Sequence, residues 1–212
     1  MTARAGFALA LVFTFAPAFV GAAHAAAPTV DELLARLDAS SKGLTTLRGE
    51  FTQRNRVKLF KQELKSTGRL FYRRPRQIRW EYLTPDPSTL VLDGERATLS
   101  TPGAEPQVFD LAHDATMRPI FEQLLFWLQP GSLGQARDQY DLAVSGSAEQ
   151  PTLELTPKSG TMARAFRKIE LRLDGKTGLL RGLLLIEKNG DEKEIVFTRL
   201  ERNAALPADA FR

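Results

Sequence analysis

Apolar and polar side chains alternate along the segment 66–94, and this pattern constrains the fold more than any other feature of the chain. The apolar members of the alternation are Leu70, Tyr72, Ile78, Trp80, Tyr82, Leu90 and Leu92. A period of two predicts β-strands with one apolar face and one solvated face. Pro75, Pro85 and Pro87 interrupt the alternation. Because proline has no amide hydrogen to donate to a sheet, these prolines mark the turns between three short strands.

The same alternation recurs along most of the chain. About eleven strands are predicted in all, and they come in runs with helices inserted between the runs, which favours a mainly β, antiparallel fold over a parallel α/β sheet. Phe51 belongs to the apolar face of the first strand. The predicted strands are 47–57, 63–73, 78–82, 89–92, 97–99, 108–111, 140–144, 153–155, 169–173, 180–187 and 194–200.

Two segments have the periodicity of helices. Thr29 and Glu32 form a capping box in front of a helix over 30–40, and Pro119 lies in the first turn of a second helix over 117–128, which is apolar around most of its circumference. A helix this apolar must be buried or must cover an apolar surface. The residues that we assign to a covering role are Leu33, Leu34 and Leu37 in the first helix, and Ile120, Phe121, Leu124 and Trp127 in the second.

The N-terminus has the layout of a secretory signal. Arg4 precedes an apolar run over 7–20, and small residues follow over 21–27. We therefore expect residues 1–25 to be a cleaved signal peptide and residues 26–212 to be one exported domain. The chain contains no cysteine, so it has neither disulfides nor the cysteine of a lipoprotein anchor.

The chain carries a formal net charge of +4, and five arginines cluster between residues 69 and 79. This cluster is compatible with a solvated sheet face, with an acidic partner or with an anionic lipid surface. Nucleic acid is not expected for an exported chain without a nucleic-acid motif.

The side chains that catalysis needs are scarce. After signal cleavage His113 is the one histidine, no Gly-x-Ser-x-Gly or phosphate-binding motif occurs, and no carboxylate pair converges. Asp110 and Asp114 flank His113, but a single histidine in a loop is interpreted as a solvated residue and not as a metal site. We therefore expect no enzyme and no metal.

The apolar sheet face admits two interpretations. It is either a sealed core, or a cavity for lipid with the helices as a lid. Alternation alone does not separate the two. The candidate cavity residues are Phe51, Leu70, Tyr72, Ile78, Trp80, Tyr82, Leu90 and Leu92.

Four stretches together resemble the LolA family of periplasmic lipoprotein carriers. They are Leu47–Gln53 (LRGEFTQ), Ser66–Pro75 (STGRLFYRRP), Ile78–Trp80 (IRW) and Pro85–Gly94 (PDPSTLVLDG). The resemblance implies an unclosed antiparallel β-barrel of eleven strands with a helical lid over an apolar cavity, without a cofactor. It implies that Arg74, in the Arg-Pro element, holds the lid shut, and that Ile78 occupies an apolar position important for handover.

The resemblance also implies a cargo and two partners. The cargo is the acyl chains of a lipoprotein, the donor is an inner-membrane ABC transporter of the LolCDE type, and the acceptor is an outer-membrane receptor of the LolB type, with the carrier itself a monomer in the periplasm. Relatives commonly continue beyond the position of Phe211, and the loop 100–106 lacks their usual aromatic residues. A carrier for another envelope lipid or glycolipid, or an RseB-like sensing module, therefore remains an alternative.

Overall fold

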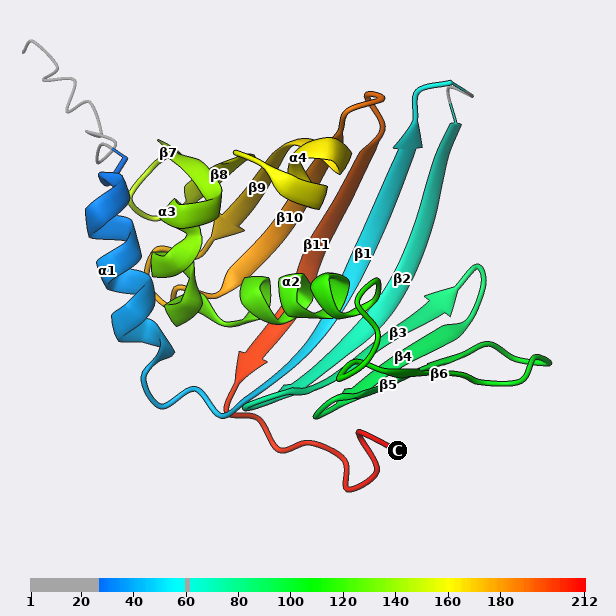
Figure 1. Cartoon of the computed structure of the whole chain (residues 1–212). Helices are drawn as coiled ribbons and strands as arrows, with labels where there is room; N and C mark the ends of the chain where they lie inside the picture. The colour runs from blue at the N-terminus through cyan, green and yellow to red at the C-terminus, as the bar shows by residue number, and fades with distance from the viewer. Residues whose placement is uncertain (1–26, 60–61) are drawn as a thin grey trace, which may run out of the picture.

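One antiparallel sheet of eleven strands dominates the structure, a computed structural model that describes residues 27–59 and 62–212 (Figure 1). The expected signal peptide lies outside the described residues. The strands are β1 (Thr46–Val57), β2 (Gln62–Arg73), β3 (Gln77–Thr84), β4 (Ser88–Asp93), β5 (Arg96–Ser100), β6 (Gln107–Asp110), β7 (Tyr140–Gly146), β8 (Pro151–Pro157), β9 (Phe166–Leu173), β10 (Leu180–Glu187) and β11 (Glu192–Arg202). The mainly β, antiparallel prediction with eleven strands is confirmed.

The strand order makes the sheet open. It runs β6-β5-β4-β3-β2-β1-β11-β10-β9-β8-β7, so two meanders are joined where the last strand, β11, pairs with the first, β1. Strands β6 and β7 are consecutive along the chain but lie at opposite edges. The sheet curves strongly but does not close into a barrel (Figure 1).

The topology explains why a helix crosses the concave face. The chain must travel from the edge at β6 to the edge at β7, and it does so through α2 (Arg118–Leu128), the 3-10 helix η1 (Pro130–Gln135) and α3 (Ala136–Gln139). Figure 1 shows α2 lying across the middle of the sheet. The crossover therefore places α2, the more apolar of the two long helices that the structure describes, over the apolar face.

Helix α1 (Val30–Ser41) lies at a flank of the sheet (Figure 1). Its N-terminus has the predicted capping box, in which Glu32 and Thr29 bond each other's backbone amides at 2.8 and 3.3 Å. A short helix, α4 (Gly160–Ala165), lies between β8 and β9. No helix in the part of the chain that the structure describes has both the length and the apolar composition that crossing a bilayer requires.

The two faces of the sheet differ in chemistry. One continuous apolar core contains the inward side chains of β1–β4 and β8–β11 together with residues of α1 and α2. The outer face carries ion pairs between neighbouring strands, such as Arg48–Glu201 at 2.8 Å and Lys168–Glu154 at 2.8 Å. The alternation in the sequence is thus realised as an apolar inside and a charged outside.

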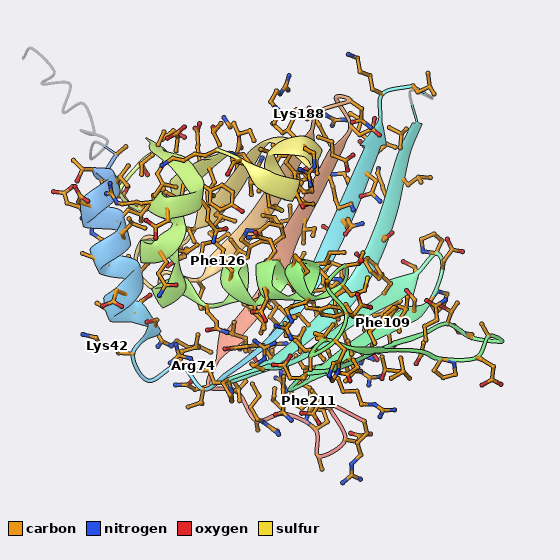
Figure 2. All side chains as sticks on the ribbon, in the orientation of Figure 1. Lys42, Arg74, Phe109, Phe126, Lys188 and Phe211 are labelled. Atoms are coloured by element: carbon orange, nitrogen blue, oxygen red, sulfur yellow. The ribbon has the colours of Figure 1, made fainter. Side chains whose placement is uncertain are left out.

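The C-terminal segment after β11 folds onto the outer face of β2 and β3. The guanidinium of Arg73 lies over the ring of Phe211, 4.9 Å from its centroid, and Arg79 donates to the backbone oxygen of Arg212 at 3.0 Å. Figure 2 places Phe211 below the sheet, on the side away from α2. Part of the arginine cluster is therefore engaged within the molecule.

Candidate functional site

All eight candidate cavity residues lie on the concave face. Strand pairing sets Leu70 opposite Trp80 and Tyr72 opposite Ile78, and the next pairing sets Trp80 opposite Leu90. The buried members are Phe51, Leu70, Tyr72, Ile78, Trp80 and Leu92, and the partly buried members are Tyr82 and Leu90. The sheet therefore gathers these side chains into one surface.

Phe51 is the centre of an aromatic cluster on this surface. Its ring centroid lies 4.6 Å from that of Trp80, 5.6 Å from that of Tyr82 and 6.4 Å from that of Phe197. The Phe51 ring packs over Gly68 on β2, where an added Cβ would meet the ring at 2.3 Å. Glycine at this position is therefore required for the ring to lie flat against the sheet.

A polar group is built into the wall beside the aromatic cluster. The Tyr82 hydroxyl donates to Gln53 Oε1 at 2.8 Å, and Gln53 Nε2 donates to Asn55 Oδ1 at 3.0 Å. Burial raises the pKa of the Tyr82 phenol, while its contacts with Trp80 and Gln53 oppose the rise. Gln53 itself is buried, and it follows the same alternation as Phe51.

The apolar surface extends across the second meander, which the candidate list from the sequence omitted. Phe197 on β11 pairs with Phe51, and Leu183 on β10 pairs with Ile195. Farther along, Leu171 pairs with Leu153. The inward side chains here could have been found from the same period of two. Along β11, however, a register shift opposite Glu50 and Phe51 interrupts that period.

Helix α2 fills the concavity of the sheet. Its buried side chains are Phe121, Leu125 and Leu128, and Leu124 and Trp127 are partly buried. A small pocket of about 10 Å³ lies where Trp127 and Leu128 meet Leu47 and Leu200. In this arrangement the buried side chains of α2 belong to the same apolar core as the inward side chains of the sheet.

Ile120 has a different environment from the other covering residues of α2. Its side chain is 59% exposed and lines a cleft of about 780 Å³ beside α2, α3 and α4. Phe126, which Figure 2 shows at the helical layer, and Met162 also line this cleft, together with polar residues such as Glu122 and Asp138. This cleft therefore lies at the margin of the site and is partly polar.

The three covering residues of α1 lie elsewhere. Leu33 and Leu37 are buried and Leu34 is partly buried, but α1 packs along η1 and the turn before β10, and it does not lie across the aromatic cluster (Figure 1). The sequence predicted two helices available to lie across the apolar face. Among the described residues one helix lies across this face, because α2 is the part of the crossover from β6 to β7 that spans the sheet, while α1 lies at its flank (Figure 1).

Arg74 lies at the end of the sheet next to the C-terminal end of α2 (Figure 2). It precedes a cis bond to Pro75, and its backbone nitrogen donates to the Thr45 oxygen at 2.9 Å. Burial raises the pKa of the neighbouring Tyr72 phenol, and the Arg74 guanidinium opposes that rise.

Direct hydrogen bonds from this turn to α2 come from its other residues. Arg76 pairs with Glu122 of α2 at 2.9 Å and with Glu95 at 3.2 Å, and these contacts raise the pKa of Arg76 despite some burial. At the other end of α2, the Gln129 side chain donates to the Pro75 carbonyl at 3.2 Å. The role of Arg76 was not found from the sequence, since it was one of five arginines without a distinguishing signal.

His113 is exposed and pairs with Asp110 at 2.8 Å, a contact that lowers the pKa of the Asp110 carboxyl. Within residues 27–59 and 62–212, no group of three or more potential metal-binding side chains gathers.

The fold and the site define a class of protein: an open antiparallel half-barrel whose apolar concave face is covered by a helix on a single crossover. The family of outer membrane lipoprotein carrier protein LolA matches residues 42–212. The chain belongs to this family.

Curated relatives agree with this assignment, and a solved structure shares the fold. An outer-membrane lipoprotein carrier protein of Xanthomonas oryzae is 33% identical over 176 residues, covering 83% of this chain and 81% of that protein. One of Dechloromonas aromatica is 30% identical over 176 residues, covering 81% and 78%. The crystal structure of MucB shares the fold with a TM-score of 0.51 at 22% identity, covering 86% of this chain and 62% of MucB.

Proposed function

We propose that this chain is a periplasmic carrier that binds the acyl chains of lipoproteins released from the inner membrane and delivers them to the outer membrane. Membership of the LolA family and the names of the curated relatives support the proposal. The single observation that carries it is the apolar concave face of the sheet, covered by one apolar helix that polar contacts tie at its ends.

The energetics of such a carrier follow from burial. Each methylene of an acyl chain gains about 0.8 kcal/mol when it leaves water, so a lipoprotein does not cross the periplasm with its chains exposed. In the closed arrangement Phe121, Leu125 and Leu128 occupy the concavity. When α2 moves away, acyl chains replace these side chains on the sheet, and the exchange of one apolar contact for another keeps loading and release reversible.

The remaining parts of the proposal follow from the family. Residues 1–25 act as the cleaved export signal, a LolCDE-type transporter supplies the cargo, and a LolB-type receptor accepts it from the monomeric carrier. Arg74 acts as the latch of the lid, at the end of the sheet where α2 ends. The chain needs no cofactor and performs no catalysis in this cycle.

Binding is tested with two neighbouring substitutions on β4. Leu90 faces the concavity and is partly buried, while Val91 is next to it and points to the opposite face. We expect Leu90→Glu to weaken displacement of a bound hydrophobic fluorophore by a triacylated lipopeptide at least tenfold, because a carboxylate is costly to bury against acyl chains. Val91→Glu is the matched control. Equal effects of the two substitutions would contradict binding on the concave face.

The latch is tested by the rate of cargo transfer to a LolB-type acceptor. Arg74 and Arg73 are adjacent and exposed, but Arg73 lies over Phe211 on the outer face. We expect Arg74→Leu to change the release rate with little change in the melting temperature, and Arg73→Leu to leave release unchanged. An unchanged rate in Arg74→Leu would exclude the latch and would leave the carrier proposal standing.

The nature of the cargo is tested by mass spectrometry of the lipids that stay bound when the protein is purified from its own periplasm. Lipoprotein N-termini would support the proposal. A phospholipid or glycolipid would replace it with a carrier for another envelope lipid. Cross-linking to a regulatory protein without transfer activity would favour the RseB-like sensing module.

A further inference from the structure

Four buried side-chain atoms in the interior of the described structure have no hydrogen-bond partner. They are Tyr72 Oη and Trp80 Nε1 on the sheet, and Gln123 Nε2 and Trp127 Nε1 on α2. Buried polar groups in folded proteins are nearly always paired, so each exception calls for an explanation. Two of these atoms belong to the sheet and two belong to α2, the helix that crosses it (Figure 1). Tyr72 pairs with Leu47 across β1 and β2, and Leu47 and Trp127 line one small pocket, while Gln123 lines the cleft beside α2, α3 and α4.

The four atoms share one chemical property. The indole nitrogens of Trp80 and Trp127 and the amide nitrogen of Gln123 are donors only, and the Tyr72 hydroxyl can donate as well. No carboxylate, amide or carbonyl oxygen of a side chain in the described residues is left unpaired in the same way. Among the buried side chains of the described residues, the unpaired atoms are therefore all able to donate, and of these the Tyr72 hydroxyl can also accept.

The surroundings do not supply the missing acceptors. Arg74 lies near Tyr72 but has only donors to offer, and the Tyr82 hydroxyl near Trp80 does not form a hydrogen bond of acceptable geometry with the indole nitrogen. The Oε1 atom of Gln123 accepts from the Tyr140 hydroxyl at 2.8 Å, which fixes the amide and leaves its nitrogen as the unused end. Gln123 and Trp127 are four residues apart, so both project from neighbouring turns of α2.

We infer that this interior selects guests whose chains carry carbonyl oxygens, namely ester- and amide-linked acyl chains, over guests with ether-linked chains of equal length. The inference rests on the proposed carrier function and states which chemistry the carrier recognises. A carbonyl oxygen has two lone pairs and no hydrogen, so it brings the acceptors that the interior lacks and no donor that would need a partner. The hydrocarbon part of the guest meets the aromatic cluster around Phe51.

The experiment compares two synthetic lipopeptides that differ only at the chain linkage. One has diacylglyceryl-cysteine with ester-linked chains, and the other is its dialkyl ether isostere. Their dissociation constants for the full mature chain are measured by displacement of a hydrophobic fluorophore. We expect the ester form to bind about tenfold more tightly, which corresponds to one or two recovered hydrogen bonds.

Substitutions test whether the unpaired donors cause the preference for the ester-linked lipopeptide. Tyr72→Phe and Trp127→Phe each remove a donor and keep an aromatic ring, and we expect their combination to bring the two affinities close together. The control is Phe121→Leu on α2, which removes buried apolar contact only. It should weaken both lipopeptides equally and leave their ratio unchanged. If Phe121→Leu also brings the two affinities together, the preference does not come from the donors and the assignment is wrong.

A second measurement needs no ligand. If the Tyr72 hydroxyl is unpaired in the free protein, Tyr72→Phe leaves the melting temperature unchanged or raises it. A clear fall would mean that water or Arg74 already satisfies the hydroxyl, and the inference would be wrong. Equal binding of the ester and ether forms to the unchanged protein would also refute it while leaving the carrier function intact. If neither lipopeptide binds, the carrier function itself fails.

Discussion

The two long helices that the structure describes, α1 and α2, are held in place by different kinds of contact. Helix α1 begins with a capping box in which Thr29 and Glu32 satisfy each other's amides, and its buried Leu33 and Leu37 pack at the flank of the sheet. Helix α2 begins at Arg118, and the side chain of its N-cap residue Met117 makes no capping bond. Its first turn has no acidic residue and its last turn has no basic residue, and the Asp114 side chain before it accepts from the Met117 amide at 2.8 Å. The helix with weaker terminal signals is the one that covers the site.

The contacts that α1 and α2 make with the rest of the molecule differ in the same way. The C-terminal turn of α1 sits on Gly178, where an added Cβ would meet the Ser40 hydroxyl at 2.3 Å, and Arg202 of β11 donates to the Ser40 carbonyl at 2.9 Å. The positive φ of Gly178, +67°, also favours glycine there. The ties of α2 to the turn after β2 are the exposed Arg76–Glu122 pair and the bond from Gln129. The difference supports the proposal that α2 is the lid, with α1 as part of the scaffold.

The largest expected effect comes from deleting one buried leucine in each helix. Leu37 in α1 is 1% exposed and Leu125 in α2 is 3% exposed. We expect Leu37→Ala to lower the free energy of unfolding by about 2–5 kcal/mol, the usual cost of such a cavity. Leu125→Ala should cost less globally and should instead speed amide exchange throughout α2, because local opening needs less than global unfolding. Denaturant titration and hydrogen exchange measure the two quantities.

Equal losses of global stability in Leu37→Ala and Leu125→Ala, without faster exchange in α2, would break the comparison. They would show that α2 unfolds only with the rest of the molecule and is as much a part of the scaffold as α1.

The contrast between the helices also marks how far the sequence could predict the molecule. The capping box at Thr29 predicted where α1 begins, and the period of two predicted the strands and the inward face that carries Phe51 and Trp80. Such patterns show which side chains are buried but not against what they pack. The position of α1 at the flank was therefore beyond them, and so was the pairing of β1 with β11, which joins residues as far apart as Leu47 and Arg202.

Other parts of the site could not be predicted from the sequence, and each had a different physical reason. Helices α3 and α4 have four and six residues, too few for a helical period to show. Along β11 the register shift opposite Glu50 and Phe51 puts both Phe197 and Leu200 opposite inward positions of β1, and this breaks strict alternation. Arg76 and Glu122 are 46 residues apart, and only the folded crossover brings them together.

An intermediate effect is expected from removing the ion pair between the sheet and α2. Arg76→Gln should change the free energy of unfolding by no more than about 1 kcal/mol, because the pair is partly exposed to solvent. It should nevertheless increase the exchange rate of the α2 amides severalfold. The matched control is Arg56→Gln, whose partner Glu192 lies on a neighbouring strand at 2.7 Å. Faster exchange of α2 in the control, or none in Arg76→Gln, would show that this pair does not hold α2 to the sheet.

The smallest expected effect is a pH dependence confined to α1. Its hydrogen bonds with Thr29, first the one from the backbone, lower the pKa of Glu32 below the ordinary value of 4.5. A lowered pKa means that the ionised carboxylate is favoured in the folded protein. Its contribution to stability is therefore complete above pH 4.5 and is lost as the pH falls through the lowered pKa.

Glu32→Gln keeps a side chain that can accept the same bond but removes the charge near the helix N-terminus. The melting temperature of this variant should lie slightly below that of the unchanged protein at neutral pH, and the two should converge in acid. Amide exchange in α2, corrected for intrinsic pH effects, should be the same in both proteins. A difference that persists in acid, or one that reaches α2, would mean that the N-terminal cap of α1 is coupled to the lid and that the two helices do not act independently.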